Sequence, residues 1–491
     1  MLFNSYEFIF LYLPVVFIGF FFIGRYNFRF AALWLAAVSL FFYGWWNPKF
    51  VVLLLGSILF NFGAGYLISH AKIAEKSKSI FFISIIANLA LLGVFKYANF
   101  FIATANTFGT QWDSLDIILP LGISFFTFTQ IAYLVDVYRG IAREYDFIYY
   151  LLFVTWFPHL IAGPVLHHKQ MMPQFASPSI YKPNPESIAV GLTLFSFGLF
   201  KKVMLADQFA LYANPVFADA AKGAQPMFNE AWIGVLAYTL QLYFDFSGYS
   251  DMAIGLSRIF NVKLPLNFDS PYKAGNIIDF WRRWHMTLSK FLRDYLYVPL
   301  GGNRKGPTRR HLNLLATMLL GGLWHGAGWN FVLWGGLHGL YLVLNHAWRK
   351  LTSTNGTAKN QFTHAIGVVI TFIAVMIAWV PFRATSMSAA KNIWYGMLGL
   401  HGFPSPNSLS DIASIPTLSW LFFGLFIIWG MPNTQQWLNE YSPAWDNVIS
   451  SGVNPRFSWK PSRTLGIITG IIFAVSILYF KKNSQFLYFQ F

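Results

Sequence analysis

The sequence contains no cysteine in its 491 residues. This absence excludes disulfide bonds, thiol nucleophiles, thiolate metal sites and iron–sulfur clusters. Charged residues are also scarce, at 11% of the chain, whereas soluble proteins carry about 25%. Hydrophobic residues make up 56% of the chain, which excludes a disordered chain and argues against a soluble enzyme of several domains. Apolar runs recur along the whole sequence, so we expect an integral membrane protein.

Acidic residues are the scarcer charged class, with 19 Asp and Glu against 35 Lys and Arg and a net charge of +16. In a soluble protein this balance would suggest nucleic acid as a partner. Here the basic residues lie between the apolar runs, so we expect them to fix topology and to contact anionic lipid headgroups. Membrane lipids are therefore predicted partners, and nucleic acid is not. The first basic residue is Arg25, so the first apolar run lacks the basic segment of a cleaved signal peptide and is expected to remain a membrane helix.

About 20 apolar residues are needed to cross a bilayer. The runs around 117–138 and 230–260 carry polar or ionised residues, which predicts re-entrant or half-depth helices surrounded by protein or water. The sequence thus predicts an all-α, polytopic membrane bundle that forms a single domain over residues 1–491. The candidate spans are residues 7–24, 30–47, 50–69, 80–97, 117–138, 147–166, 187–206, 230–248, 312–324, 329–346, 364–382, 417–431 and 464–480.

The distribution of basic residues predicts the topology. Basic residues cluster at 70–79 and 139–146, whereas the loop 103–116 between them has two aspartates and no basic residue. By the positive-inside rule, the two basic stretches are cytoplasmic and the N-terminus is outside. Segment 432–463 is then cytoplasmic, and the tail 481–491 lies on the outer side.

Two carboxylates, Asp245 and Asp251, lie inside or beside an apolar run. An ionised Asp in mid-bilayer costs about 2.5–3.5 kcal/mol on insertion scales, so each of them requires a partner or a water-filled cavity. One interpretation is structural: each aspartate pairs with an arginine or caps a helix that starts near Ser250. The other is that they belong to a functional site.

A basic, aromatic stretch follows at 279–297. Helical spacing places Trp281, Trp284, His285 and Leu288 on one face, which predicts an interfacial amphipathic helix with Arg282, Arg283 and Arg293 off that face. These arginines either contact lipid phosphate or also bind an anionic, phosphate-bearing donor. The next turn, Gly301-Gly302-Asn303-Arg304-Lys305-Gly306, is basic but lacks the Walker A spacing, so an ATP-driven pump is unsupported.

His325 ends an apolar run among small residues that permit close helix approach. A buried neutral imidazole near a hydroxyl suits a general base; the alternative is a hydrogen-bonded core residue. A metal site is discounted, because there is no cysteine and His338 is not at helical spacing from His325. His159 stands at a helix break and is a candidate to line a cavity, and Asn330 is a further polar residue expected within the membrane.

Together these motifs resemble the membrane-bound O-acyltransferase (MBOAT) family, and most of all its bacterial alginate O-acetylase subgroup. The resemblance extends over nearly the whole chain, and the order of so many motifs makes it specific. The stretches that carry it are residues 95–100, 121–125, 157–164, 243–251, 280–285, 293–297, 301–304, 321–326 and 486–491.

The resemblance implies a helical bundle in the bacterial inner membrane, with a central funnel pinched at His325. It implies that His325 is catalytic and that His285 is a second, supporting histidine. The implied donor substrate is cytoplasmic acetyl-CoA, with no bound cofactor and no metal, and we expect Arg282, Arg283, Arg304 and Lys305 to hold its phosphates. The implied partner is a periplasmic or membrane-anchored acetyltransferase of the SGNH-hydrolase type. The acceptor would be a polysaccharide. The first expectation is an alginate-type exopolysaccharide, and peptidoglycan and cellulose are the alternatives.

The segment 481–491 is rich in aromatic residues. An exposed apolar tail is unfavourable in water, so we expect it to be buried in a groove or in the funnel. It resembles the aromatic motif of a small membrane peptide that serves D-alanyl-transferring relatives. By that analogy Tyr488 would offer its hydroxyl to His325, accept the acetyl group and pass it to the partner. The alternative is an aromatic anchor at the membrane interface.

Two other functional classes remain open at this point. A secondary transporter or flippase of a lipid-linked saccharide would also use broken helices and charged residues near the midplane. A scaffold for polysaccharide export would leave the histidines structural. Release of CoA from acetyl-CoA by the purified protein would favour the enzyme.

Overall fold

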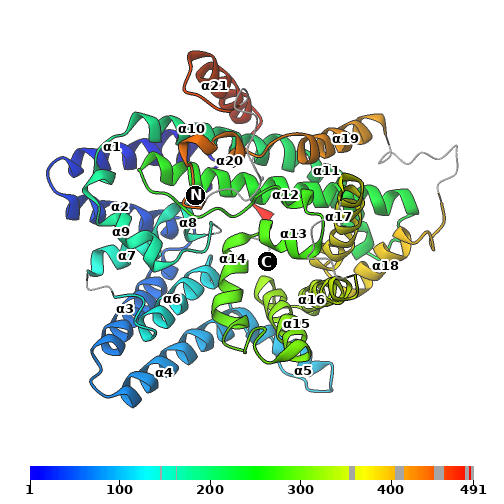
Figure 1. The fold of residues 1–491 in the computed structure, drawn as a ribbon, viewed down its shortest axis with the longest axis horizontal. Helices are drawn as coiled ribbons and strands as arrows, with labels where there is room; N and C mark the ends of the chain where they lie inside the picture. The colour runs from blue at the N-terminus through cyan, green and yellow to red at the C-terminus, as the bar shows by residue number, and fades with distance from the viewer. Residues whose placement is uncertain are drawn as a thin grey trace.

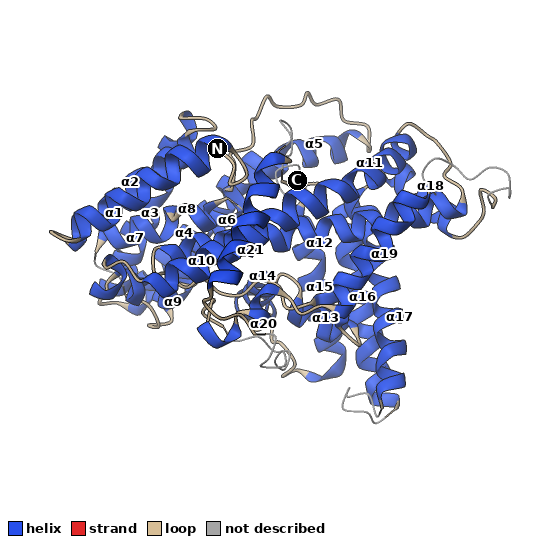
Figure 2. Ribbon diagram, turned by 90° about the horizontal axis from the view of Figure 1, so that it is seen from above, coloured by secondary structure: helices blue, strands red, loops and turns tan. Residues whose placement is uncertain are grey.

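The computed structural model describes residues 1–143, 146–161, 163–352, 360–403, 414–446, 458–480 and 486–487. This part of the chain contains helices and no strand (Figure 2), which confirms the all-α prediction. The elements, in chain order, are η1 (Glu7–Tyr12), α1 (Leu13–Gly24), α2 (Phe28–Gly44), α3 (Lys49–His70), α4 (Ala74–Leu92), η2 (Gly93–Tyr97), α5 (Ala98–Asn106), α6 (Ile123–Tyr138), α7 (Phe147–Thr155), α8 (Phe157–Leu160), α9 (His168–Phe175), η3 (Pro178–Tyr181), α10 (Pro185–Phe200), η4 (Lys201–Ala206), α11 (Asp207–Ala221), α12 (Phe228–Ile259), η5 (Pro271–Lys273), α13 (Ile277–Arg283), α14 (Met286–Leu292), η6 (Arg293–Tyr297), α15 (Gly306–His325), α16 (Trp329–Leu351), α17 (Gln361–Arg383), α18 (Met387–Met397), α19 (Ile415–Gly430), α20 (Thr434–Trp437), η8 (Asn439–Tyr441) and α21 (Arg463–Leu478).

Five helical stretches of the described chain are long and apolar enough to cross a membrane, and several shorter apolar helices accompany them. The protein is therefore a multi-pass membrane protein. Each predicted apolar run contains a helix or two consecutive helices, although the runs 117–138 and 147–166 extend beyond theirs. The long stretches are Glu7–Gly24, Lys49–His70, Ala74–Asn106, Pro185–Ala221 and Gln361–Arg383.

Short helices lie between the long ones. The prediction of re-entrant or half-depth helices agrees with the run 117–138, where the 16-residue helix α6 follows non-helical residues. It is wrong for the run 230–260, which is occupied by the continuous 32-residue helix α12. The run at 147–166 divides into α7 and α8, which break at Trp156. Neither piece is long enough to span a bilayer. Both are buried by the surrounding helices, which is where irregular backbone is tolerated at membrane depth.

The helix α12 forms the centre of the bundle and is buried over nearly its whole length (Figure 1). It packs along α10 with pairs of glycines at the crossing. A Cβ atom added to Gly248 would lie 2.7 Å from the carbonyl oxygen of Gly198, and one added to Gly198 would lie 2.6 Å from that of Gly248. Only glycine permits this approach of the two backbones. On the other side of α10, α21 lies at the outside of the bundle.

Asp245 and Asp251 both lie within α12, and each forms an ion pair with a lysine of the π-helical turn η4. Lys202 Nζ is 2.7 Å from Asp245 Oδ1, and Lys201 Nζ is 2.6 Å from Asp251 Oδ2. The structural interpretation was therefore right that each aspartate is paired, but the partners are lysines rather than arginines. Neither aspartate caps a helix, because α12 continues to Ile259.

The prediction of a single amphipathic helix at 279–297 is wrong. The helix α13 ends at Arg283, and α14 begins at Met286. Between them Trp284 is extended and His285 adopts a left-handed conformation with φ of 42°. This break removes Trp284 and His285 from any helical face and directs the His285 ring into the bundle, where it is fully buried.

Candidate active site

His325 is the last residue of α15, and a lysine from another helix holds the end of that helix. Lys96 Nζ donates to the carbonyl oxygens of Trp324 and His325, at 2.6 and 3.2 Å, and to Ser124 Oγ at 3.3 Å. The last carbonyls of a helix have no partner within the helix and carry a partial negative charge, so an ammonium group stabilises them. Lys96 therefore fixes the backbone from which the His325 ring projects.

A cavity of about 150 Å³ lies beside this helix end. His325, Lys96 and Ser124 contribute its polar lining. Most of the apolar lining comes from the segment 119–125, which follows the loop 103–116 that the charge pattern places outside the cytoplasm. We name this space the upper cavity; its lining is Lys96, Leu119, Pro120, Leu121, Gly122, Ile123, Ser124, Phe125, Ile161, Trp324 and His325.

His285 is oriented by Asn267. Its Nδ1 lies 3.0 Å from Asn267 Oδ1, an oxygen that also accepts from Thr287 Oγ1 at 3.0 Å. The amide nitrogen of Asn267 donates instead to Ser250 Oγ at 3.4 Å. Because Asn267 presents an acceptor to the ring, the proton of His285 lies on Nδ1 and Nε2 carries the lone pair.

The two histidines lie close together although 40 residues separate them in sequence. Their ring centroids are 6.3 Å apart. Aromatic rings surround His325, with Trp324 at 4.9 Å, Trp334 at 5.0 Å and Phe382 at 5.3 Å. The resemblance implied both histidines at one site, and the fold brings them together in a mainly apolar environment in which both side chains are buried.

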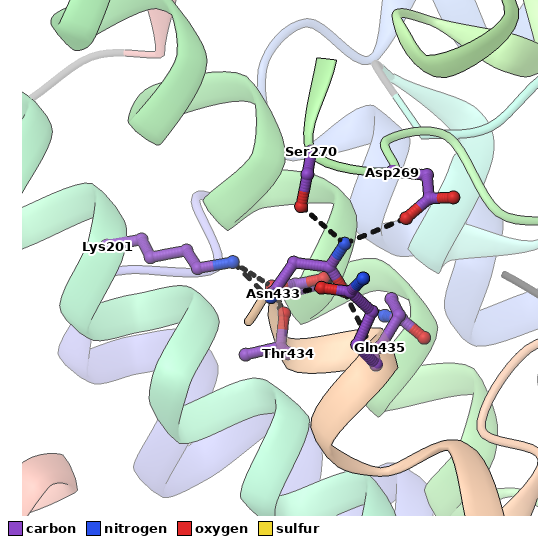
Figure 3. Close-up of polar contacts among 8 residues, drawn as sticks. Lys201, Asp269, Ser270, Asn433, Thr434 and Gln435 are labelled. Carbon is purple, nitrogen blue, oxygen red and sulfur yellow. Dashed lines mark hydrogen bonds and ion pairs between the residues drawn. The ribbon is translucent and has the colours of Figure 1, made fainter. Parts of the chain in front are cut away.

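The backbone around His285 is held by the loop that precedes α13. Met286 N donates to Asn267 O at 2.9 Å, and Asp269 N donates to Arg283 O at 3.0 Å. The loop is in turn fastened from a distant part of the chain: Asn433 Nδ2 donates to Asp269 Oδ1 at 3.0 Å and to Ser270 Oγ at 2.9 Å (Figure 3).

The same view shows how α20 is anchored to the bundle. Lys201 Nζ donates to Thr434 Oγ1 at 3.0 Å (Figure 3). Both side chains also donate to the carboxylate of Asp251. Gln435 donates to the second oxygen of that carboxylate at 3.1 Å. The pair Lys201–Asp251 thus has a structural role: it holds α20, which holds the loop that orients His285.

A second cavity, of about 350 Å³, is strongly basic. It is lined by Arg139, with which the predicted cytoplasmic loop 139–146 begins. A polar chain forms one wall, in which Tyr295 OH donates to Asp136 Oδ1 at 3.0 Å and lies 3.2 Å from His167 Nδ1. We name this space the lower cavity; its lining is Asp136, Arg139, Ile141, His167, Lys169, Gln170, Lys290, Arg293, Asp294, Tyr295 and Val298.

A column of aromatic rings connects the two cavities. Tyr295 of the lower cavity contacts Phe291, with centroids 4.9 Å apart, and Phe291 stacks on Phe128 at 4.3 Å. Phe128 stacks on Trp324 at 5.3 Å, next to His325 of the upper cavity. The rings of Phe128 and Phe291 therefore lie between the basic cavity and the histidine pair.

The four residues expected to bind the donor do not line either cavity. Arg283 Nε forms an ion pair with Asp279 Oδ2 at 3.0 Å, and Arg282, Arg304 and Lys305 are exposed. Their predicted contact with CoA phosphates stays a prediction. Different basic residues, Arg139, Lys169, Lys290 and Arg293, line the lower cavity.

The remaining predicted residues have mainly structural contacts. His159 is buried with Nε2 3.0 Å from the carbonyl oxygen of Phe153, and it lines neither cavity. Asn330 Nδ2 donates to the carbonyl oxygen of Ala384 at 2.7 Å. Tyr488 lies outside the described residues. Within the described ranges, no group of three or more His, Asp or Glu side chains is arranged to hold a metal ion.

Sequence reasoning missed Lys96 and Asn267. Lys96 carries a usable signal, because a lysine in an apolar run is by default a functional-site candidate. Asn267 carries none, since an asparagine in a loop is ordinary and only the fold places it against His285.

Comparison with known proteins decides the family. The profile described as "MBOAT, membrane-bound O-acyltransferase family" matches residues 138–387, a range that contains both histidines and Asn267. The chain belongs to the membrane-bound O-acyltransferase family. It is therefore a membrane acyltransferase.

Three relatives of this MBOAT protein show how their names and their degrees of similarity vary. A peptidoglycan O-acetyltransferase of Helicobacter pylori is 45% identical over 432 residues, 82% of this chain and 80% of the relative. A probable alginate O-acetylase of Azotobacter vinelandii is 36% identical over 461 residues, 88% of this chain and 89% of the relative. A teichoic acid D-alanyltransferase of Streptococcus thermophilus is 29% identical over 282 residues, 53% of this chain and 68% of the relative.

Proposed function

We propose that this acyltransferase takes acetyl groups from cytoplasmic acetyl-CoA and passes them across the bacterial inner membrane for O-acetylation of a polysaccharide outside. The observation that carries the proposal is the pair His285–His325, with ring centroids 6.3 Å apart beside the upper cavity. An acetyl group is small and neutral, whereas its carrier is large and charged. A site enclosed in the membrane can pass the group without passing the carrier.

In the proposed reaction, His325 acts as general base. It accepts the proton of an acceptor hydroxyl, whose oxygen attacks the thioester carbonyl of the donor. The new C–O bond forms as the C–S bond breaks, and the thiolate leaving group takes up the proton as CoA departs. His285, with its Nδ1 proton directed to Asn267, supports the site rather than transferring the proton itself.

The lower cavity is proposed to receive the phosphate-bearing part of the donor. Arg139 and Lys169 are exposed at its rim, and the charge pattern of the sequence favours a cytoplasmic position for this side. Lys290 and Arg293 also line the cavity but pair with Asp446 at 3.0 Å and Asp294 at 2.7 Å. Two exposed basic side chains beside two that are paired with carboxylates favour binding of a polyanion. Such a ligand can bind the exposed pair and compete with the carboxylates for the other two.

Tyr488 is proposed as the acceptor of the acetyl group from the donor. A phenol has a pKa near 10, so it is easier to deprotonate than a serine hydroxyl, and its acetyl ester is reactive enough to hand the group on. The proposed recipient is a periplasmic or membrane-anchored acetyltransferase of the SGNH-hydrolase type. That partner would deliver the acetyl group to the polysaccharide.

The proposal is tested with purified protein and radiolabelled acetyl-CoA. We expect release of CoA and transfer of label to the protein, and loss of both in His325→Ala by about 10²–10⁴-fold. Tyr488→Phe should release no CoA above background and take up no label, because it keeps the ring and lacks the hydroxyl. Transfer of label to the Tyr488→Phe variant would overturn the role of Tyr488 as acceptor. Full activity of the His325→Ala variant would overturn the role of His325 as general base.

The acceptor is tested in cells that lack the gene. Relatives named for peptidoglycan and for alginate both cover most of the chain, so both polymers are candidates, with an alginate-type exopolysaccharide as the first to test. Acetate released by mild alkali from purified exopolysaccharide and from purified cell wall is measured with and without the gene. The polymer that loses its acetate is the acceptor.

A further inference from the structure

The short segment Phe486–Leu487 lies inside the helix bundle, next to α12. Phe486 is 2% exposed and Leu487 is 4% exposed, as in the core helices. In Figure 1 it is the small red piece beside α12. An aromatic and an aliphatic residue that follow α21, the last α-helix described, are thus packed as core residues, so the bundle has a place built to receive them.

The apolar part of this place is made by two rings of α12. The Phe486 ring stacks on Tyr249 with centroids 4.4 Å apart and meets Phe246 at 5.9 Å. Tyr249 also stacks on Phe3, at 4.9 Å. Two rings stacked on one must occupy opposite faces, so Tyr249 is sandwiched between Phe3 and Phe486.

The polar part is a single carboxylate. The backbone N–H of Leu487 donates to Asp245 Oδ2 at 3.1 Å. A buried backbone N–H needs an acceptor, and here a side chain supplies it. Because the donor is a backbone N–H, this hydrogen bond depends on where the segment lies and not on which side chain residue 487 carries.

Asp245 belongs to a buried cluster of charges. Its Oδ1 lies 2.7 Å from Lys202 Nζ, and the same ammonium group is 2.9 Å from Asp207 Oδ1. With both aspartates ionised, these three side chains carry one more negative charge than positive. Excess charge is costly in a buried site unless dipoles compensate for it, and the N–H of Leu487 is such a dipole.

We infer that Asp245 is a positioning residue whose carboxylate clamps the backbone of segment 486–487 inside the bundle. The clamp lies close to the chemistry, since Phe246 meets the His285 ring edge-on at 4.8 Å and 90°. The effect that we expect on catalysis rests on the proposed role of Tyr488. The existence of the clamp does not rest on that role, because the hydrogen bond between Leu487 and Asp245 is independent of the reaction.

The test exploits the absence of cysteine. Leu487→Cys places one thiol in the full chain and keeps the backbone N–H that Asp245 binds. The rate of its modification by a maleimide reports how often the segment leaves the bundle. Adding Asp245→Asn leaves one acceptor oxygen where the carboxylate used two, one for Lys202 and one for Leu487. We expect labelling to become about tenfold faster or more.

Asp245→Asn should still fold, because Lys202 keeps its ion pair with Asp207. The matched control is Asp251→Asn, which alters the other aspartate–lysine pair of α12 and η4 without touching the segment. Ala36→Cys, at a fully buried position of α2, reports general loosening. An unchanged labelling rate in Asp245→Asn, or an equal rise in Asp251→Asn or at Ala36→Cys, would overturn the clamp.

An activity measurement separates positioning from packing. The clamp contacts the segment and not the lower cavity, so Asp245→Asn should lower kcat for CoA release and leave the apparent KM for acetyl-CoA unchanged. A rise in KM alone would contradict the inference. If Tyr488→Phe retained full activity, the relay would fall while the labelling result would stand, so the two proposals fail separately.

Discussion

The side-chain oxygen of Asn267 lies 3.0 Å from Nδ1 of His285 and fixes the tautomer of that ring. The relationship depends on the break between α13 and α14, because His285 reaches Asn267 from a left-handed conformation with φ of 42°. A continuous helix would have pointed the imidazole elsewhere. The histidine pair of the candidate active site is therefore assembled from a helix end and a helix break.

The contact between Asn267 and His285 can be tested by two substitutions. Asn267→Ala removes the acceptor, and we expect kcat to fall by about 10- to 100-fold because a buried N–H loses its partner. Asn267→Asp keeps an acceptor for Nδ1 and should retain more activity than the alanine variant. Steady-state rates of CoA release measure both. Equal losses in the two variants would show that the amide acts by packing alone.

Lys96 is expected to support catalysis by holding the end of α15. Lys96→Met removes the charged donor to the carbonyl oxygens of Trp324 and His325, and kcat should fall about tenfold or more. The control is Tyr97→Phe, which removes a neutral hydrogen bond of 3.0 Å to Leu323 O at the same helix end. A larger loss in Tyr97→Phe than in Lys96→Met would contradict the prediction.

Two sets of basic residues are alternative candidates for binding the phosphates of acetyl-CoA. Reversing charge at Arg139 and Lys169, in the lower cavity, should raise the apparent KM for acetyl-CoA about tenfold, and added salt should mimic the effect because exposed charges are screened over about 8–10 Å. The matched variant reverses Arg304 and Lys305 in the exposed glycine turn. If only the second variant raises KM, the original sequence prediction is right and the lower cavity is not the donor site.

The aromatic column predicts how acyl chain length is limited. Phe291 stacks on Phe128 at 4.3 Å between the lower cavity and Trp324. Phe291→Ala should open space there, and the rate with propionyl-CoA relative to acetyl-CoA should rise about tenfold, the effect typical of one methylene in a hydrophobic site. The ratio of kcat/KM values for the two donors measures it. A fall in both rates with an unchanged ratio would place the limit elsewhere.

Much of the fold follows from the sequence because a bilayer leaves few options for the backbone. Apolar runs of sufficient length must be helical, so each predicted run contains one or two helices of the structure. The sequence also identified Asp245 and Asp251 as residues in need of partners. It could not name Lys201 and Lys202 as those partners, because only the fold places the turn η4 against α12.

The candidate site was only partly accessible to prediction. His325 could be singled out at the end of an apolar run, but its closeness to His285 came from the resemblance alone. The predicted helix at 279–297 failed because periodicity does not register a single residue in a left-handed conformation. The lower cavity was missed because its basic lining comes from distant segments, with Arg139, Lys169 and Lys290 brought together only by folding.

The turn Lys201–Ala206 has a consequence for the evolution and engineering of this protein. A π-turn corresponds to one residue inserted into an α-helix. Lys202 and Asp207 are five residues apart, a spacing that the wider π-turn places on one side of the helix, so that Lys202 Nζ lies 2.9 Å from Asp207 Oδ1 and 2.7 Å from Asp245 Oδ1 of α12. Pairing of these buried charges thus depends on the number of residues in the turn as well as on their identity, so an alignment or a designed variant of this protein has to preserve the length of the segment 201–207.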